Sequence, residues 1–391
     1  MTPDVNTYLD QLRESVPEIS VLEAHRGQQQ GRGLLIDVRE LDEMAAGSPP
    51  GALRLPKGTL EMNVGNRVPD RNTPLYLLCA SGRRSLVAGH CLRMLGYAEV
   101  ASVRGGFESW KQHGLPFARP KMLGAGARER FKRHLIIPEI GEEGQLKLLE
   151  ARVLVVGAGG IGSPVALYLA AAGVGTIGLV DDDVVDRSNL QRQILHTDDS
   201  VGQPKVESAR RRLLALHPDL EVRTYNERLT ADNVDGIFAD YDLVLDGTDN
   251  FTTRYLIGDA CVKHGLANVH GSVFRFEGQV STFWPDAPGG GGPCYRCAYP
   301  APPPPEMAPS CAEAGVLGVL PGMVGMVCAT EAIKLIAGFG DLLVGQLLVF
   351  DARDWAFDTY ELFRRDDCPY CRHATGEYPE YTAYETACAL G

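Results

Sequence analysis

The segment Arg152-Val-Leu-Val-Val-Gly-Ala-Gly-Gly-Ile-Gly162 joins an apolar run directly to a glycine-rich loop. The apolar run is typical of a buried strand, and the apolar residues from Ser163 to Ala172 suit a helix. The glycines of the loop are Gly157, Gly159, Gly160 and Gly162. Glycines let the backbone approach a phosphate closely, and the N-terminus of the helix faces the negative charge. The segment therefore predicts a nucleotide-binding strand, loop and helix.

The same alternation continues after this segment. Thr176 to Val180 and Leu243 to Asp246 read as further buried strands, and Val206 to Leu216 reads as a helix. Strands that alternate with helices favour parallel pairing. We expect a large doubly wound, Rossmann-like α/β domain.

Polar residues after the glycine loop favour ATP over other nucleotides. The loop alone suits NAD, FAD or ATP equally, and Asp181 lies about 20 residues further on, where an acid meets a ribose hydroxyl. The polar residues that follow are Asp183, Asn189, Arg192, Lys205 and Asp249. Cations suit triphosphate charge and carboxylates suit Mg²⁺, whereas hydride transfer needs neither. The set therefore indicates a phosphate-handling site with ATP and Mg²⁺.

The N-terminal part has its own alternation of strands and helices. Leu34 to Arg39, Leu75 to Cys79 and Val100 to Val103 read as strands, and Ser85 to Leu95 reads as a helix. A further helix opens near Gly105. This pattern predicts a second, smaller α/β domain with a parallel sheet, so the fold class is α/β with two domains.

A cysteine lies at one strand-to-helix turn of the small domain, in Cys79-Ala-Ser-Gly-Arg-Arg84. Backbone N–H groups converge in such a turn, and the helix N-terminus adds positive potential. These features and the positive charge of Arg84 favour a thiolate nucleophile at Cys79. The alternative is a structural cysteine at the end of a strand.

Two C-x-x-C pairs lie near the C-terminus and supply the residues Cys294, Cys297, Cys368 and Cys371. Four thiolates fill a closed tetrahedral zinc site, so we expect structural Zn²⁺. A thioredoxin-like redox role for the pair from Cys368 to Cys371 is the alternative.

Composition and net charge limit the possible partners and the cellular compartment. The 391 residues are 45% hydrophobic and 23% charged, and we read no apolar run as long enough to cross a bilayer, so we expect no membrane partner. A net charge of −12 argues against a nucleic-acid partner. The polar start of the chain lacks a secretory signal, and ten cysteines then indicate thiol and metal chemistry in a reducing cytoplasm.

Residues 18–118 resemble a rhodanese domain. The resemblance rests on Ile36-Asp-Val-Arg-Glu40, Pro50-Gly-Ala-Leu53, the Cys79 loop and Gly105-Gly-Phe-Glu-Ser-Trp110. In that family the cysteine carries sulfur as a persulfide. Related phosphatases have a loop one residue longer, so the shorter loop here favours sulfur. Asp37 and Arg39 are expected to brace the fold.

Residues 127–375 resemble the MoeB/ThiF family of bacterial relatives of ubiquitin-activating enzymes. The matching motifs are the glycine loop, both C-x-x-C pairs, Arg130-Phe-Lys-Arg133, Ser188-Asn-Leu-Gln-Arg-Gln193, Gly202-Gln-Pro-Lys-Val206 and Thr248-Asp-Asn250. Residues 119–126 form the expected linker, and residues 376–391 form a C-terminal tail of unassigned role. Most relatives with this fusion carry the rhodanese domain second, so the order here is reversed.

The MoeB/ThiF resemblance implies a role for each site residue. Asp181 holds the ribose, and Asp249 serves Mg²⁺ and the reacting centre. The residues that hold the phosphates are Asn189, Arg192 and Lys205. Arg133 matches an arginine that reaches the ATP site of a neighbouring subunit, which implies a homodimer. A cysteine at the position of Cys311 bonds to the carrier or resolves a disulfide in some relatives, and others do without it.

These resemblances imply one fused reaction. The chain would adenylate the C-terminal glycine of a ubiquitin-like sulfur-carrier protein, with the small subunit of molybdopterin synthase as the first candidate and a thiamine-type carrier as the second. Persulfide on Cys79 would then form a thiocarboxylate, with a cysteine desulfurase as the donor. The rival functions are a rhodanese domain that only docks the carrier, an NAD-dependent oxidoreductase and a tRNA-modifying dehydratase.

Overall fold

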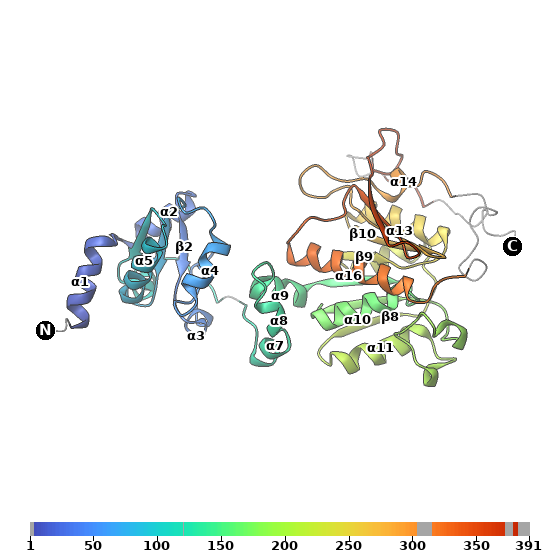
Figure 1. The fold of residues 1–391 in the computed structure, drawn as a ribbon, viewed down its shortest axis with the longest axis horizontal. Coiled ribbons are helices and arrows are strands. Elements are labelled where there is room, and N and C mark those ends of the chain that lie inside the picture. The colour runs from blue at the N-terminus through green and yellow to red at the C-terminus, as the bar shows by residue number, and fades with distance from the viewer. Residues whose placement is uncertain (1–3, 120, 303–314, 372–377, 382–391) are drawn as a thin grey trace. The chain divides into compact units, whose positions relative to one another are not determined.

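The chain forms two compact units in a computed structural model that describes residues 4–119, 121–302, 315–371 and 378–381. The first unit comprises Met1–Arg130 with Ile136–Pro138. The second comprises Phe131–Leu135 with Glu139–Gly391. Both units are mixed helix and strand structures, as the sequence predicts (Figure 1).

The first unit is built on a parallel sheet, and the described residues supply five strands to it. The strands are β1 (Glu18–Ile19), β2 (Leu34–Asp37), β3 (Leu53–Arg54), β4 (Leu75–Leu78) and β5 (Val100–Val103), in the spatial order β1-β5-β4-β2-β3. The apolar side chains of the central strands are buried, because helices cover a parallel sheet on both faces. The three predicted strands are thus confirmed.

Helices surround this sheet, and two of them begin shortly after the ends of β4 and β5. These helices are α1 (Val5–Ser15), α2 (Val21–Gln29), α3 (Leu41–Ala45), α4 (Leu60–Arg67), α5 (Arg83–Met94) and α6 (Gly106–Gln112), and the unit also includes the short α7 (Ala125–Arg130). Left-handed glycines precede two of them, Gly82 (φ 92°) before α5 and Gly105 (φ 72°) before α6. Because Gly82 ends the turn early, α5 begins at Arg83, two residues before the predicted start.

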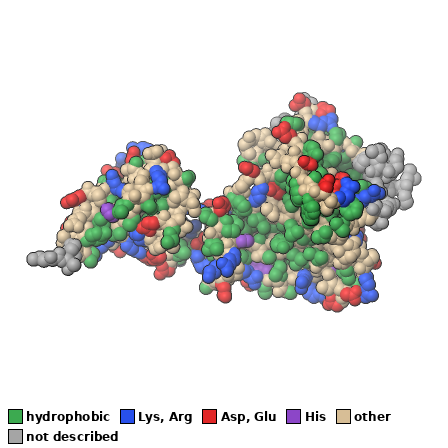
Figure 2. Space-filling model, viewed as in Figure 1, with side chains coloured by type: hydrophobic (Ala, Val, Ile, Leu, Met, Phe, Trp, Pro, Cys, Tyr) green, Lys and Arg blue, Asp and Glu red, His purple; other side chains and the backbone are tan. Residues whose placement is uncertain are grey.

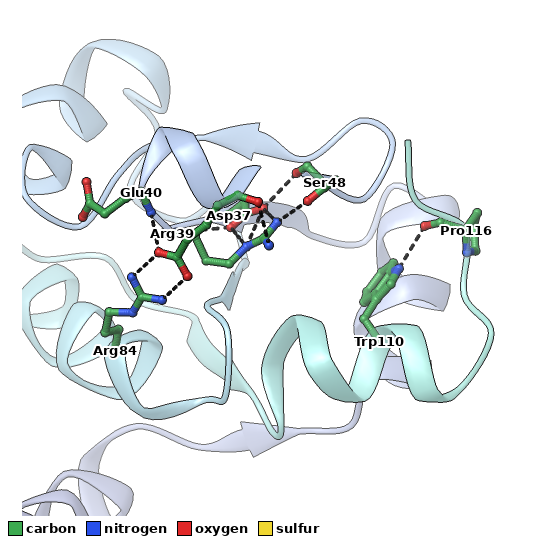
Figure 3. Close-up of polar contacts among 9 residues, drawn as sticks. Asp37, Arg39, Glu40, Ser48, Arg84, Trp110 and Pro116 are labelled. Atoms are coloured by element: carbon green, nitrogen blue, oxygen red, sulfur yellow. Dashed lines mark hydrogen bonds and ion pairs between the residues drawn. The ribbon is translucent and has the colours of Figure 1, made fainter. Parts of the chain in front are cut away.

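A buried ion pair braces the end of β2 (Figure 3). The Arg39 guanidinium lies 2.6 Å from a carboxylate oxygen of Asp37 and also donates to the Gly47 carbonyl at 2.7 Å. The Ser48 hydroxyl donates to the same Asp37 oxygen at 2.8 Å. The guanidinium also lies 3.9 Å from the ring centroid of Phe107. Both charges are buried and fully partnered, which supports the predicted bracing role.

The second unit is built on a mixed sheet, to which the described part of the chain supplies eight strands. The strands are β6 (Arg152–Val156), β7 (Thr176–Val180), β8 (Glu221–Tyr225), β9 (Leu243–Asp246), β10 (Ala267–Phe274), β11 (Glu277–Phe283), β12 (Gln346–Asp351) and β13 (Ala356–Glu361). Their spatial order is β13-β12-β11-β10-β9-β6-β7-β8. Strands β6 to β10 pair in parallel, and this is the Rossmann-like half that the sequence predicts.

The antiparallel half from β10 to β13 was not predicted. The turn between β10 and β11 is Arg275 and Phe276, and Arg275 adopts a left-handed φ of 52°. Tight hairpin turns normally carry glycine or asparagine at such positions. The usual sequence signal for a hairpin is therefore missing here.

The helices of the second unit cover both sides of its sheet. They are α8 (Lys132–Leu135), α9 (Gly141–Glu150), α10 (Gly162–Ala172), α11 (Lys205–Leu216), α12 (Val234–Phe238), α13 (Phe251–His264), α14 (Tyr295–Ala298) and α16 (Leu320–Ala337), with short 3₁₀ turns at η1 (Arg187–Asn189) and η2 (Asp198–Ser200). The predicted helices over residues 163–172 and 206–216 are confirmed, each starting one residue earlier.

The sequence was expected to contain no apolar run long enough to cross a bilayer, and helix α16 corrects that expectation. It has 18 residues and a mean hydropathy of 1.5, so by length and composition it could cross a membrane. In the described part of the chain it contacts α9, α10 and strands β10 and β11, and half of its residues are buried (Figure 1). Its apolar composition therefore suits a core helix.

On the face shown in Figure 2, acidic and basic side chains are interspersed with exposed hydrophobic ones.

The N-terminus of α6 holds the loop that contains Cys79. The N–H of Phe107 donates to the Cys79 carbonyl at 2.7 Å, and the N–H of Glu108 donates to the Ala80 carbonyl at 3.0 Å. Gly106 makes this approach possible, because a Cβ at that position would lie 2.2 Å from the Cys79 carbonyl oxygen. Its φ of 57° is also left-handed.

We predict that Gly106→Ala destabilises the first unit. The left-handed backbone costs about 1–2 kcal/mol for alanine, and the overlap with the Cys79 carbonyl adds to that cost. Gly65→Ala is the matched control, because Gly65 lies within α4 and its Cβ would have nothing within 4 Å. Urea unfolding of the full chain should show a loss for Gly106→Ala and no loss for Gly65→Ala. Equal stabilities would contradict this account of the loop.

Candidate functional site

Cys79 lies immediately after β4, in the turn that leads to α5. Its side chain is 1% exposed, and its Sγ accepts a hydrogen bond from the Gly82 N–H at 3.1 Å. The Ser85 hydroxyl lies 3.4 Å from Sγ. The Gly82 N–H thus points at the sulfur, and a backbone donor of this kind favours a thiolate or persulfide anion.

Two serine hydroxyls form hydrogen bonds that support the Cys79 loop. The Ser85 hydroxyl donates to the Gly82 carbonyl at 3.0 Å and lies 2.8 Å from the Ser102 hydroxyl. Both serines are fully buried. The conformation of Gly82, and hence the N–H that faces Sγ, is set by these contacts. Neither Ser85 nor Ser102 was predicted from the sequence, because neither carries a motif signal.

Arg84, the predicted partner of Cys79, forms an ion pair with Glu43 of α3 (Figure 3). Its two terminal nitrogens donate to the two Glu43 oxygens at 2.6 and 2.7 Å. The hydrogen bonds to Glu43 raise the pKa of Arg84, and the charge of Cys79 adds to this effect. Arg84 therefore contributes positive potential near the sulfur, while its hydrogen bonds go to Glu43.

The second site is a pocket of about 320 Å³ at the carboxyl ends of β6, β7 and β9. This volume lies in the range of roughly 300–1,000 Å³ that is usual for small-molecule sites. The predicted site residues that line it are Gly157, Gly159, Gly160, Asp181, Asp183, Arg192, Lys205 and Asp249. The parallel sheet thus brings together residues from four separate parts of the chain.

Gly162 does not line the pocket but makes the loop possible. A Cβ on Gly162 would lie 1.8 Å from the Gly157 carbonyl oxygen. A Cβ on Gly157, whose φ is 92°, would lie 3.1 Å from the carbonyl oxygen of Gly247 in the loop after β9. Gly162 therefore serves the close packing of backbones, and Gly159 faces the pocket with more open space.

Lys205 is the buried cation of the pocket. Its ammonium group lies 2.7 Å from an Asp183 oxygen and 3.9 Å from an Asp181 oxygen. Asp181 also accepts hydrogen bonds from the N–H groups of Ala158 and Asp183. Burial raises the pKa of Asp181, and Lys205 opposes that shift. The carboxylate is thereby held between the glycine loop and the lysine.

Asn189 orients Arg192. The Asn189 side-chain oxygen accepts a hydrogen bond from Arg192 at 2.8 Å, and only Arg192 of this pair lines the pocket. Gln193 also lines the pocket, and its buried side-chain oxygen has no hydrogen-bond partner among the described residues. An unpartnered buried acceptor at this point fits a bound group with a donor.

The loop that carries Asp249 is held by residues that were not predicted to have a role. Arg254 of α13 donates two hydrogen bonds to the Thr248 carbonyl, at 3.1 and 2.7 Å. Asp246, at the end of β9, accepts from the Thr248 N–H and hydroxyl and from His270 of β10. Asp246 ends a predicted strand and could have been noticed there. His270 lies inside an apolar strand and gives no signal.

Arg133 lies on α8 with an exposed side chain and does not line the pocket of its own chain. Cys311 lies outside the described residues.

The four predicted thiols come together in one buried cluster. The Sγ atoms of Cys294 and Cys297 lie 3.7 Å apart, those of Cys294 and Cys368 3.5 Å, and those of Cys297 and Cys371 3.4 Å. A tetrahedral site with Zn–S bonds of about 2.3 Å has edges of about 3.8 Å. The cluster therefore fits a metal ion with four thiolate ligands, and it joins α14 to the segment after β13.

Sequence comparisons match both units to known families. The ThiF family model matches residues 131–370, and the rhodanese-like domain model matches residues 20–113. The chain is 53% identical over 261 residues to the probable adenylyltransferase/sulfurtransferase MoeZ of Mycobacterium tuberculosis, covering 67% of this chain and 65% of MoeZ. It is 48% identical over 268 residues to the SAMP-activating enzyme E1 of Haloferax volcanii, covering 68% of this chain and 97% of that protein. The chain therefore aligns with slightly less than two thirds of MoeZ.

A comparison of structures supports the fold. Escherichia coli MccB, in its crystal structure with MccA-N7isoASN, aligns with a TM-score of 0.56 and 20% identity, over 62% of this chain and 75% of MccB. Together with the family match over most of the second unit, this likeness agrees with the glycine loop and the sheet described above. The chain belongs to the ThiF family and carries a rhodanese-like domain ahead of its ThiF domain.

Proposed function

We propose that this protein adenylates the C-terminal glycine of a ubiquitin-like sulfur-carrier protein and then converts the adenylate to a thiocarboxylate. The observation that carries the proposal is the presence, in one chain, of a phosphate-type pocket with a buried lysine and a cysteine cradled by a loop N–H. The names of two similar proteins, an adenylyltransferase/sulfurtransferase and a SAMP-activating enzyme, support it.

The first step needs cations, and the pocket supplies them. A carboxylate oxygen of the carrier attacks the α-phosphorus of ATP, and pyrophosphate leaves. Lys205 and Arg192 offset the charge on the phosphates, and Asn189 orients Arg192. Asp181 holds the ribose. The product is an acyl-adenylate, in which AMP is a good leaving group.

The second step uses Cys79. The terminal sulfur of a Cys79 persulfide attacks the acyl carbon, AMP leaves, and an acyl disulfide forms. A second thiol then attacks the Cys79 sulfur, so the carrier leaves as a thiocarboxylate and a disulfide remains on the protein. We propose Cys311 for that thiol. A persulfide would put its outer sulfur about 2 Å beyond the buried Sγ.

The residues present fit two metal ions of different roles. Asp249 is an exposed carboxylate at the pocket and would hold Mg²⁺, which neutralises phosphate charge when bound. The cluster of buried thiols would hold Zn²⁺ as a structural ion.

The proposed partners follow from the chemistry. The carrier is a ubiquitin-like protein, with the small subunit of molybdopterin synthase as our first candidate, and a cysteine desulfurase is the persulfide donor. We propose a cytoplasmic homodimer, in which the exposed Arg133 reaches the pocket of the other subunit.

The direct test is mass spectrometry of candidate carriers after incubation with the protein, ATP, Mg²⁺ and a sulfur source. The replacement of one oxygen by sulfur at the C-terminus would identify the substrate. The absence of pyrophosphate release with every glycine-ended carrier would overturn the proposal.

Cys79→Ala separates sulfur transfer from docking. We predict that this variant loses thiocarboxylate formation by more than about 100-fold, because the nucleophile is gone, and keeps carrier-dependent ATP–pyrophosphate exchange. Cys91→Ala is the matched control, a half-buried cysteine of α5 in the same unit. An unchanged thiocarboxylate yield in Cys79→Ala would mean that the rhodanese-like unit only docks the carrier.

Lys205→Ala tests the pocket. We expect kcat/KM for ATP–pyrophosphate exchange to fall by about 10²-fold, because a buried cation that faces the phosphates is lost. Lys147→Ala, which removes an exposed lysine paired with Glu143 on α9, should retain full exchange. Equal activity in the two variants would exclude Lys205 from the reaction.

Metal analysis tests the thiol cluster. We predict one zinc ion per chain by mass spectrometry of the metal content, and its loss in Cys368→Ser together with a lower melting temperature. Cys328→Ala should keep the metal, since this buried cysteine of α16 lies outside the cluster. A metal-free wild-type protein with a reversible disulfide between Cys368 and Cys371 would support the redox alternative instead.

A further inference from the structure

The loop between β9 and α13 has no regular secondary structure, yet it carries Asp249 into the pocket. Arg254 holds it from the helix side through two hydrogen bonds to the Thr248 carbonyl. Asp246 holds it from the end of β9, because one Asp246 oxygen accepts hydrogen bonds from the Thr248 N–H at 3.0 Å and from the Thr248 hydroxyl at 2.7 Å. The orientation of the Asp246 carboxylate therefore decides where this loop lies.

The other Asp246 oxygen accepts a hydrogen bond from Nδ1 of His270 at 2.8 Å. The two residues face each other across neighbouring parallel strands, in register, and each is 1% exposed. The two carboxylate oxygens thus have separate partners, since one binds the loop and the other binds the histidine.

The surroundings of the pair lower the pKa of both groups. Burial raises the pKa of Asp246, but His270, Arg254 and Thr248 outweigh burial and hold it below its ordinary value. Burial lowers the pKa of His270. The carboxylate is therefore ionised beside a neutral imidazole, and Nδ1 carries the proton that it donates.

The imidazole ring cannot turn freely. Its centroid lies 5.2 Å from the ring of Tyr295 and 5.9 Å from the ring of Phe283. Tyr295 is itself held by Tyr255 at 5.1 Å and follows Cys294 of the thiol cluster. Packing thus keeps Nδ1 aimed at Asp246.

We propose that His270 is a positioning residue, which locks the Asp246 carboxylate so that Thr248 and then Asp249 are held in the orientation that binds Mg·ATP. The proposal rests on the proposed function, in which Asp249 serves Mg²⁺. Stability alone does not require such a pair, since apolar residues of similar volume can replace a buried polar pair without loss.

The test is the Mg²⁺ dependence of ATP binding, measured by calorimetry on the full chain without any carrier. His270→Leu removes the donor and keeps the volume, whereas His270→Asn keeps an N–H near the position of Nδ1. We expect His270→Leu to need about 10-fold or more Mg²⁺ for half-maximal binding, the usual effect of removing an outer partner of a metal ligand. His270→Asn should remain within about 3-fold of the wild type.

The matched control is His264→Leu. His264 forms the same type of contact, 2.8 Å to Asp235, in the same unit and away from the pocket. It should leave the Mg²⁺ dependence unchanged. If His270→Leu does not fold, Thr248→Val removes the hydroxyl bond to Asp246 from the loop side and should shift the Mg²⁺ requirement in the same direction.

An unchanged Mg²⁺ requirement in His270→Leu, or an equal shift in His264→Leu, overturns the positioning role. A wild-type protein that binds Mg·ATP but shows no carrier-dependent exchange overturns the proposed function instead, and the Mg²⁺ titration still decides on His270. A wild-type protein that binds no ATP overturns both.

Discussion

The nucleotide pocket depends on the contact of three backbone segments that have no side chains between them. Gly157 follows β6, Gly162 begins α10, and Gly247 follows β9. A Cβ on any of the three would come within 3.1 Å of a backbone atom of another. Because the segments touch, the phosphate loop and the Asp249 loop meet at one edge of the sheet. The pocket can form only there, at the carboxyl ends of the parallel strands.

Both units place a buried carboxylate at the end of a strand and surround it with hydrogen-bond partners. In the first unit Asp37 pairs with Arg39 and Ser48 beside the α3 segment that carries Glu43, the partner of Arg84. In the second unit Asp246 binds the loop that carries Asp249. A buried charge is costly without partners, so each carboxylate can hold only one arrangement of its neighbours.

The thiol cluster connects parts of the second unit that are far apart in the sequence. It joins α14 to the segment after β13, and the residue that follows its first cysteine packs on His270. The rings of Tyr255, Phe283, Tyr295 and Tyr299 pack against one another around this contact. The antiparallel half of the sheet thus carries the cluster, and the parallel half carries the nucleotide loops.

The amino-acid sequence by itself determined the central strands, the glycine loop, the Cys79 turn and the two C-x-x-C pairs, because each of these features is written within a few neighbouring residues. The hairpin at Arg275 was not predicted, because its turn lacks the usual glycine or asparagine. Only the tertiary structure decided that Arg84 pairs with Glu43, 41 residues away, and that Asp246 pairs with His270, 24 residues away. Such partners are chosen by strand register and by helix packing, and no local pattern of residues encodes either.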